Sequence, residues 1–421
     1  MMIPGMSRPF TLLVMLAVLA GCRAAPSKTT LKMLIDPDTT GGWKEITRLF
    51  ETAHPDIGLQ LVEGPPSTNT REEMYTSAFL SGSSAYDVVW MDVIWTPKFA
   101  AAGWLKPLDQ WVTPAQLMKD HYEAAVNASV YQGHVYRVPV TSGGGVLYYR
   151  KDLLEQGGFK PPQTWTELVT IAKKLQRPPE RWGFVFQGQQ YEGLICAFLE
   201  VLWGAGGDVV APDGQVLIDR PEAVAALQWL VDAIYVEKIV PEAVTTYQEE
   251  ECRLLFEQGH AVFMRNWPYV WTSAQKEGSP VKGKIGLVPM VHRPGNFRSA
   301  STLGGWGVGI SKFSKHPEEA WKFVTFLSGT EVQKLMHLKM GGQPSRTALY
   351  RDTEVLATAP FYRELFSVFE GARPRPVHPR YAKISDILAA SLSQALVRQQ
   401  TPQAALRQAA QDIRRLLAAG S

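Results

Sequence analysis

Strand-type and helix-type segments alternate along this chain from residue 31 onward, and this order constrains the fold more than any other feature. Residues 31–35 form an apolar run of strand length, and apolar residues then recur at helical spacing over 43–53, up to the His54-Pro55 stop. Three further segments continue the pattern: a strand over 59–62, a helix over 71–80 and a buried strand over 86–91. This alternation predicts an α/β fold with a parallel-type sheet covered on both faces.

The rest of the chain keeps the same organisation. Thr164 and Glu167 have the spacing of a capping box and predict the start of a helix. Pro221 and Pro317 each stand near the start of an apolar-periodic segment, as proline does in the first turn of helices. Three short segments are strand-like, at 261–264, 285–288 and 308–310, and the tail from Ile384 is predicted to be mostly helical, with Thr401-Pro402 opening its last segment.

Length and charge limit the possible functions. With 421 residues, the chain is long enough for two lobes with separate cores. Charged residues make up 20% of the sequence and the net charge is only +3. No window is basic enough to follow a phosphate backbone, so nucleic acid is not an expected partner.

The first 25 residues have the pattern of an export signal. Arg8 is followed by an unbroken apolar stretch over 10–20, which is too short for a helix to cross a bilayer and fits a signal peptide. The end of this stretch, Leu19-Ala20-Gly21-Cys22, resembles the lipobox at which bacterial lipoprotein precursors are cleaved. The resemblance implies a signal peptide over 1–21, a lipid anchor on Cys22 and a flexible linker over 22–30. The mature chain then has two cysteines, Cys196 and Cys252, which are either free thiols or one disulfide.

Motifs of known enzyme classes are scarce. The sequence contains no G-x-S-x-G motif, and its eight histidines never have the H-x-x-x-H spacing of a helical zinc site. Residues 278–285 resemble a phosphate loop but lack its Ser/Thr and lead into a strand, which favours a turn. Gly143 to Gly145 precede a strand, which favours a flexible crossover between lobes, and Glu249 to Glu251 are interpreted as a solvated helix face. No metal or cofactor is expected.

Tryptophan is abundant, with 13 residues, and indole rings suit the C–H faces of sugars. Asp92, Trp267 and Trp306 each stand at or just past a predicted strand. In open α/β sheets, ligands bind beyond the carboxyl ends of strands, so these three side chains are candidates for one cleft. Core packing is the common alternative for a single tryptophan. Asp92 is a stronger candidate, because an acid that ends an apolar strand is costly to bury without a partner.

Several stretches closely resemble the trehalose/maltose-binding proteins of bacterial and archaeal ABC importers, within the wider family of extracellular solute-binding proteins. They occur in the family's order over nearly the whole mature chain: Met91 to Trp95, Gly103 to Leu108, Leu147 to Leu154, Gln190 to Leu194, Arg265 to Tyr269, Thr302 to Trp306 and Pro374 to Pro376. The resemblance implies two α/β lobes of the maltose-binding-protein type, with a sugar enclosed between them. The expected parts are 31–140 with about 306–345 for the first lobe, and 141–305 with about 346–421 for the second.

The resemblance also assigns roles to individual residues. Asp92 would accept hydrogen bonds from sugar hydroxyls, Arg71 and Arg375 would donate to ligand oxygens, and Trp267 and Trp306 would stack on the sugar. Gly305 would allow the backbone to approach the ligand closely. Tyr191 and Glu192 match a motif of the family without an assigned role.

Three positions depart from the pattern. Where the trehalose/maltose binders carry a tyrosine and an aspartate after Pro139-Val140, this chain has Thr141 and Gly143, which are expected to take their place at the ligand site. Gly41 replaces a glutamate before Trp43. Losing acceptors for buried hydroxyls costs about 1–3 kcal/mol each. We therefore expect a ligand that is smaller than trehalose or differently substituted, such as glucosylglycerol.

The expected function is solute capture without chemistry, by a monomeric lipoprotein on the outer side of the cytoplasmic membrane. Its partners would be a small glycoside and the transmembrane subunits of an ABC importer. The glycoside would be a glucosylglycerol-like conjugate or a disaccharide such as trehalose, sucrose or maltose. Two alternatives remain open: a binder of a glycerophosphodiester or another phosphorylated polyol, which Arg71 and Arg375 would grip, and an exported glycoside-active enzyme with two cooperating carboxylates.

Overall fold

The computed structural model of this protein describes Met1 and residues 28–211 and 214–419. The export signal and Cys22 lie outside the described residues, so both stay predictions. None of the helices in these ranges combines the length and the apolar character that a membrane crossing requires.

The chain enters the fold through a strand–helix–strand unit. β1 (Thr29–Ile35) and β2 (Ile57–Glu63) pair in parallel, with Leu31 opposite Leu59, and α1 (Gly42–Ala53) connects them. Trp43, Ile46 and Phe50 of α1 are buried at helical spacing, as the sequence pattern predicts. The first predicted unit is therefore confirmed.

A second sheet brings distant segments together. β13 (Trp306–Ile310) lies between β3 (Val88–Asp92) and β6 (Val138–Pro139) and is antiparallel to both. A further sheet has the order β11 (Ile285–Val288), β8 (Val146–Arg150), β10 (Ala261–Asn266) and β9 (Trp182–Val185). Its pair β9–β10 is parallel, while β8 runs against β10 and β11. The expectation of a parallel-type sheet is therefore only partly right, because β8 and β13 run antiparallel to the strands on either side of them.

Helices cover these sheets, and their starts agree with the sequence signals. The larger ones are α2 (Thr68–Leu80), α3 (Trp95–Ala101), α6 (Lys151–Gly157), α7 (Trp165–Leu175), α8 (Glu192–Trp203), α9 (Pro221–Tyr235), α10 (Glu249–Glu257), α12 (Pro317–Leu327), α13 (Thr330–Met340), α15 (Tyr362–Glu370), α16 (Tyr381–Leu396) and α17 (Pro402–Ala418). The shorter ones are α4 (Pro114–Leu117), α5 (Glu123–Asn127), α11 (Val270–Ala274), α14 (Thr353–Thr358) and the 3₁₀ helices η1 (Glu242–Thr246) and η2 (Thr347–Arg351). The capping box of Thr164 and Glu167 is present at α7, and Pro221, Pro317 and Pro402 occupy the first turns of their helices.

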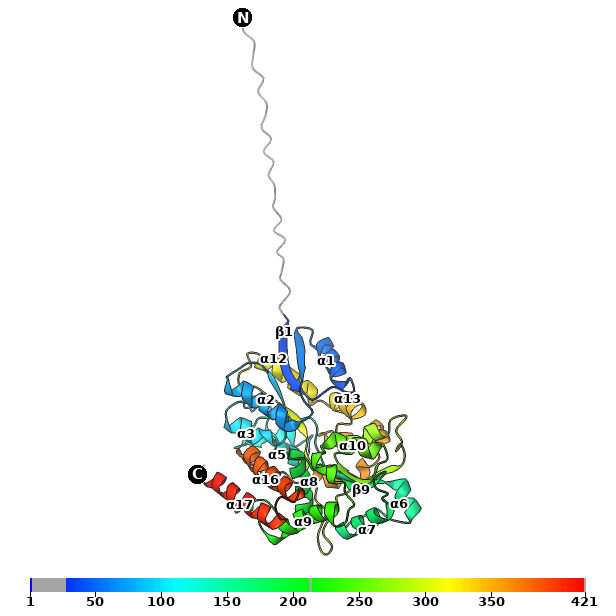
Figure 1. Cartoon of the computed structure of the whole chain (residues 1–421). Coiled ribbons are helices and arrows are strands. Elements are labelled where there is room, and N and C mark those ends of the chain that lie inside the picture. The colour runs from blue at the N-terminus through cyan, green and yellow to red at the C-terminus, as the bar shows by residue number, and fades with distance from the viewer. Residues whose placement is uncertain (2–27, 212–213, 420–421) are drawn as a thin grey trace.

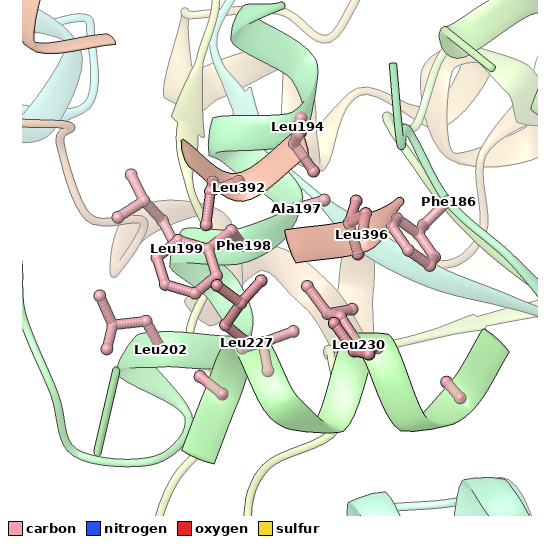
Figure 2. Packing of buried hydrophobic residues seen from close by; sticks show 14 of the residues in the cluster. Phe186, Leu194, Ala197, Phe198, Leu199, Leu202, Leu227, Leu230, Leu392 and Leu396 are labelled. Atoms are coloured by element: carbon pink, nitrogen blue, oxygen red, sulfur yellow. The ribbon is translucent and has the colours of Figure 1, made fainter. Parts of the chain in front are cut away.

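Hydrophobic residues gather into separate cores. One contains residues of β1, α1, β13 and α12, and another contains residues of α8, α9, α16 and α17. Figure 1 places β1, α1 and α12 at one end of the molecule and α6, α7 and α9 at the other. Figure 2 shows the second core, where Phe198 of α8, Leu227 of α9 and Leu392 of α16 meet. α8 is buried on all sides, and its sequence is accordingly apolar apart from Glu192 and Glu200, which both form buried ion pairs.

Two short strands, β7 (Gly143–Gly144) and β12 (Leu303–Gly304), pair with each other outside the main sheets. A separate small hairpin is formed by β4 (Val130–Tyr131) and β5 (His134–Val135). A side chain on Gly144 would bring its Cβ within 2.1 Å of Ser301 Oγ. The glycines after Thr141 therefore allow two crossing segments to lie close together.

Candidate ligand-binding site

Asp92 and Trp306 face each other across neighbouring strands. They are register partners at the end of β3 and the start of β13. The Trp306 ring stacks on Trp90, with centroids 5.7 Å apart and planes 13° apart, and meets Trp95 edge-on at 5.5 Å. Trp90 and Trp95 thus hold the Trp306 ring in place beside the Asp92 carboxylate, at the end of β3.

Arg71 approaches the same ring from α2. Its guanidinium carbon lies 4.7 Å from the Trp306 centroid, and Nη1 donates to the carbonyls of Pro65 and Pro66 at 2.8 and 3.1 Å. Burial lowers the pKa of Arg71, and the nearby charges of Asp36 and Asp92 oppose this shift. The guanidinium is therefore buried close to the carboxylates of Asp36 and Asp92.

Asp36 is a residue of this region that the sequence analysis missed. It follows β1 and accepts a hydrogen bond from Trp90 Nε1 at 3.0 Å. The signal was available, because Asp36 ends an apolar strand in the same way as Asp92 does.

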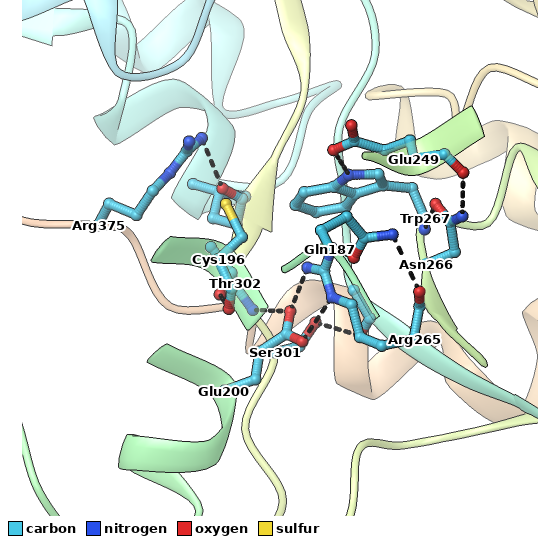
Figure 3. A network of polar contacts seen from close by, with 12 residues as sticks. Gln187, Cys196, Glu200, Glu249, Arg265, Asn266, Trp267, Ser301, Thr302 and Arg375 are labelled. Carbon is cyan, nitrogen blue, oxygen red and sulfur yellow. Dashed lines mark hydrogen bonds and ion pairs between the residues drawn. The ribbon is translucent and has the colours of Figure 1, made fainter. Parts of the chain in front are cut away.

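Trp267 follows β10 and lies against the backbone of the crossing segment. A Cβ on Gly304 would come within 2.6 Å of the Trp267 ring. Arg265 also lies over the indole, with its guanidinium carbon 4.3 Å from the ring centroid, and Trp267 Nε1 donates to Glu249 Oε1 at 3.3 Å (Figure 3). Trp267 therefore packs against Gly304, and only Gly305 stands between Gly304 and Trp306 in the sequence.

Glu249 orients two predicted site residues. Its Oε2 accepts from the Tyr191 hydroxyl at 2.6 Å, while its Oε1 accepts from Trp267. Burial is the main cause of a strong rise in the pKa of Tyr191, and the Glu249 charge adds to it. The interpretation of Glu249 to Glu251 as a solvated face is wrong for Glu249, because the first turn of α10 points toward Trp267. Glu250 is also engaged, accepting from Tyr269 at 2.7 Å.

Arg375 connects two acids that come from distant parts of the chain. Nη2 donates to Asp92 Oδ1 and Nη1 to Glu192 Oε1, both at 2.9 Å. Glu192 also accepts from Tyr381 Oη at 2.7 Å and from Ser385 Oγ. Burial raises the pKa of Glu192 against the attraction of Arg375. Protein donors thus reach both oxygens of Glu192, so this residue positions Arg375 rather than offering a free acceptor.

The backbone near Trp306 is tightly constrained. Thr141 Oγ1 accepts from the Trp306 backbone N–H at 2.9 Å. Gly305 has a φ of 141°, and a Cβ there would lie 2.3 Å from the Thr141 carbonyl oxygen. Gly143 pairs with Gly304. Only glycine fits position 305 without moving the crossing segment.

The ten predicted ligand-binding residues therefore form one connected set. Direct contacts join Arg71, Asp92, Thr141, Gly305, Trp306 and Arg375, and Glu192 joins through Arg375. Gly143 and Trp267 join through Gly304, and Tyr191 joins through Glu249. The backbone N–H of Glu192 also donates to Asn69 Oδ1 of α2 at 3.4 Å, so α2 and α8 touch.

The arrangement brings two indole rings, carboxylates and guanidinium groups together in one place. That combination suits a neutral polyhydroxylated ligand, whose C–H faces stack and whose hydroxyls both donate and accept. Across the described ranges, no three His, Cys, Asp or Glu side chains are grouped so as to hold a metal ion. Cys196 and Cys252 are both buried and free.

Comparison with known proteins is consistent with this geometry. The model of the bacterial extracellular solute-binding protein family matches residues 36–334. A probable ABC transporter-binding protein of Deinococcus radiodurans is 37% identical over 359 residues, covering 83% of this chain and 84% of the relative.

Two solved structures extend the likeness to the fold. Maltose-bound MalE3 of T. maritima superposes with a TM-score of 0.88 and 40% identity, over 92% of this chain and all of the other. An ABC transporter solute-binding protein of Agrobacterium radiobacter K84 in complex with ribitol gives 0.83 and 27%, over 93% and 100%. The expected two-lobed α/β fold of the maltose-binding-protein type is thereby confirmed.

Proposed function

This chain belongs to the bacterial extracellular solute-binding protein family, and from that premise we propose that it is the substrate-binding lipoprotein of an ABC importer for a small glycoside. The relative from Deinococcus radiodurans is named for an ABC transporter, and MalE3 was solved with maltose. Both names support the proposal that this member of the family also binds a solute for an ABC importer.

One observation carries the proposal: Trp267 and Trp306 flank Gly304-Gly305, with Asp92 opposite Trp306 and Arg71 over its ring. Indole faces favour the C–H surface of a pyranose, while the carboxylate and guanidinium supply an acceptor and donors for its hydroxyls. The carboxylates near Arg71 also bear on the charge of the ligand. Asp36 and Asp92 act on Arg71, which favours a neutral ligand over the phosphorylated alternative.

The proposed ligand is a hexose joined to a small polyol, such as glucosylglycerol. Thr141 uses its hydroxyl on the Trp306 N–H, and Gly143 and Gly41 bring no side chain. The acceptors that a larger disaccharide would need there are missing, at about 1–3 kcal/mol each. Complexes with maltose and with ribitol in similar proteins support a fold that accepts both sugar rings and polyols.

Capture proceeds by lobe closure. The lobes are proposed as 31–140 with 306–345 and 141–305 with 346–421, a division supported by the separate cores around β1 and around α8. In this division Trp306 belongs to the first lobe and Trp267 to the second. A ligand that touches both stabilises the closed form, because only in that form does it contact both lobes at once. The importer then recognises the closed, loaded monomer. No bond is made or broken.

The lipid anchor on Cys22 keeps the protein at the membrane beside its importer. Cys22→Ala is expected to release the protein from washed membranes into the soluble fraction, as followed by immunoblot. Unchanged membrane retention of the variant contradicts the anchor and leaves the ligand proposal untouched.

A thermal-shift screen tests the ligand class. The panel contains glucosylglycerol, trehalose, maltose, sucrose and a glycerophosphodiester. We expect glucosylglycerol to raise the unfolding temperature most, since a ligand at 100 times its dissociation constant adds about 2.7 kcal/mol. The largest shift with the glycerophosphodiester would instead support the phosphorylated alternative, and release of free sugar on long incubation would indicate an enzyme.

A further inference from the structure

The side chain of Gln343 fills the space in front of Gly143. A Cβ built on Gly143 would lie 1.7 Å from Gln343 Oε1 and 2.7 Å from Nε2. The backbone fixes this arrangement, because the Ser142 N–H donates to the Gln343 carbonyl at 2.9 Å and Thr141 forms a bridge with Pro344. The loop after α13 therefore puts an amide where residue 143 has no side chain.

Gln343 differs from other buried glutamines of this chain. Gln187 uses both amide atoms on Arg265, and Gln333 donates to Ser328 and accepts from the Ser345 N–H. Gln343 is 8% exposed, and the only described group that its Nε2 is recorded to approach is the Tyr350 hydroxyl, so at least one of its two N–H groups has no protein acceptor. Buried amides are normally satisfied, so an unused donor at this depth points to a ligand.

The surroundings add a second unused group. Ser142 is 1% exposed and its Oγ also makes no hydrogen bond with the described part of the chain. Burial raises the pKa of Tyr350, and the contact with the Gln343 amide opposes this rise, while the Tyr350 hydroxyl itself donates to the Pro344 carbonyl at 3.0 Å. Ser142 Oγ and one N–H of Gln343 thus keep hydrogen-bonding capacity, and their backbones are joined by a hydrogen bond.

This pair adjoins the candidate site. Thr141, the residue before Ser142, accepts from the Trp306 N–H, and a Cβ on Gly305 would lie 2.8 Å from Ser142 Cα. The loop that carries Gln343 is therefore adjacent to the backbone that carries Trp306.

We infer that Gln343 is a specificity-determining residue that hydrogen-bonds a hydroxyl of the ligand and limits its size. The inference rests on the proposed function and deepens it. A neutral amide both donates and accepts, so it suits a hydroxyl and needs no counter-charge. Its bulk takes the volume that the missing side chain at 143 leaves.

Gln343→Leu and Gln343→Ala separate binding from folding. Leucine removes a buried polar group while keeping most of its volume, so the unfolding temperature of the free protein is expected to stay level or rise. Calorimetric affinity for glucosylglycerol should fall by about 5- to 150-fold in both variants. Gln399→Ala, at an exposed glutamine, is the matched control and should bind like the wild type.

The selectivity ratio distinguishes a ligand contact from a structural role. Gln343→Ala opens space, so affinity for trehalose relative to glucosylglycerol should rise, which a general loss of stability does not produce. Unchanged affinities in both Gln343 variants, with Trp267→Ala still abolishing binding, overturn the inference and leave the proposed function standing. A wild-type protein that binds neither sugar nor maltose overturns both.

Discussion

Arg375 and Asp92 form a buried ion pair, with 2.9 Å between Nη2 and Oδ1. The same guanidinium holds Glu192 at 2.9 Å through Nη1. The pair joins β3 to the segment before α16, and Glu192 extends the link to α8. Residues almost 300 positions apart in the sequence thus meet at the candidate site.

Arg375→Gln is expected to destabilise the fold strongly. The change leaves Asp92 and Glu192 buried without their cation, and breaking a buried pair in this way costs about 3–5 kcal/mol. Arg373→Gln is the matched control. Its ion pair with Asp208 is exposed, so the loss should stay within about 1 kcal/mol. Urea unfolding of both variants measures the difference, and equal stabilities would show that the buried pair contributes little.

Trp267→Ala is expected to remove glycoside binding while the protein remains folded. The indole is partly exposed and its loss takes away one stacking face, which lowers affinity by at least ten-fold if stacking contributes about 1.5 kcal/mol. Trp321→Ala serves as the control, because Trp321 stacks on Trp111 at 5.1 Å in another part of the chain. Fluorescence titration compares the two, and equal affinities would remove Trp267 from the site.

Acid is expected to weaken the fold through His121. Burial, helped by Arg346, lowers the pKa of His121 from 6.5 to about 4. The unfolded chain therefore takes up this proton first as the pH falls, so stability is complete above the unfolded pKa and declines below it. The loss from this residue amounts to about 2 kcal/mol between pH 7 and pH 5.

Unfolding of the wild type and His121→Asn at both pH values isolates this contribution. Asparagine keeps a polar partner for Ser345 Oγ, which lies 2.8 Å from His121 Nδ1. The variant should lose less stability on acidification than the wild type. Parallel pH profiles for the two proteins contradict the assignment to His121.

Glu200→Gln is expected to disrupt the network behind Trp267. Glu200 and Arg265 are fully buried and bonded twice, at 2.7 and 2.8 Å, and Glu200 also accepts from the Thr302 N–H (Figure 3). The substitution leaves the Arg265 guanidinium without its carboxylate partner, which should lower the free energy of unfolding by about 3–5 kcal/mol. Glu237→Gln, at the exposed pair with Lys173, should cost less than about 1 kcal/mol by the same denaturation assay.

Local patterns in the sequence were sufficient for much of the fold. The strand–helix unit from β1 to β2, the capping box at α7 and the prolines that open α9, α12 and α17 all depend on neighbours within a few residues. Strand direction did not follow from such patterns. β13 lies between β3 and β6 because of long-range packing, and no local signal encodes that contact.

The candidate site shows the same division. Asp92 and Trp267 were proposed from their positions at the ends of strands, and Asp36 has the same kind of position but was overlooked. Trp306 instead opens β13 and comes beside Asp92 through the pairing of β13 with β3. Glu249 was misjudged, since three consecutive acids give no hint that a distant indole needs one of them. Gln343 was not considered at all, because its meeting with Gly143 depends on how the loop after α13 folds back.

Calorimetric titration of the full chain with glucosylglycerol, trehalose and maltose tests the central claim most directly. The account predicts saturable binding with one site per chain, tightest for glucosylglycerol and lost in Trp267→Ala. Absence of heat with every glycoside, or undiminished binding by Trp267→Ala, would contradict the capture of a small glycoside between Trp267 and Trp306.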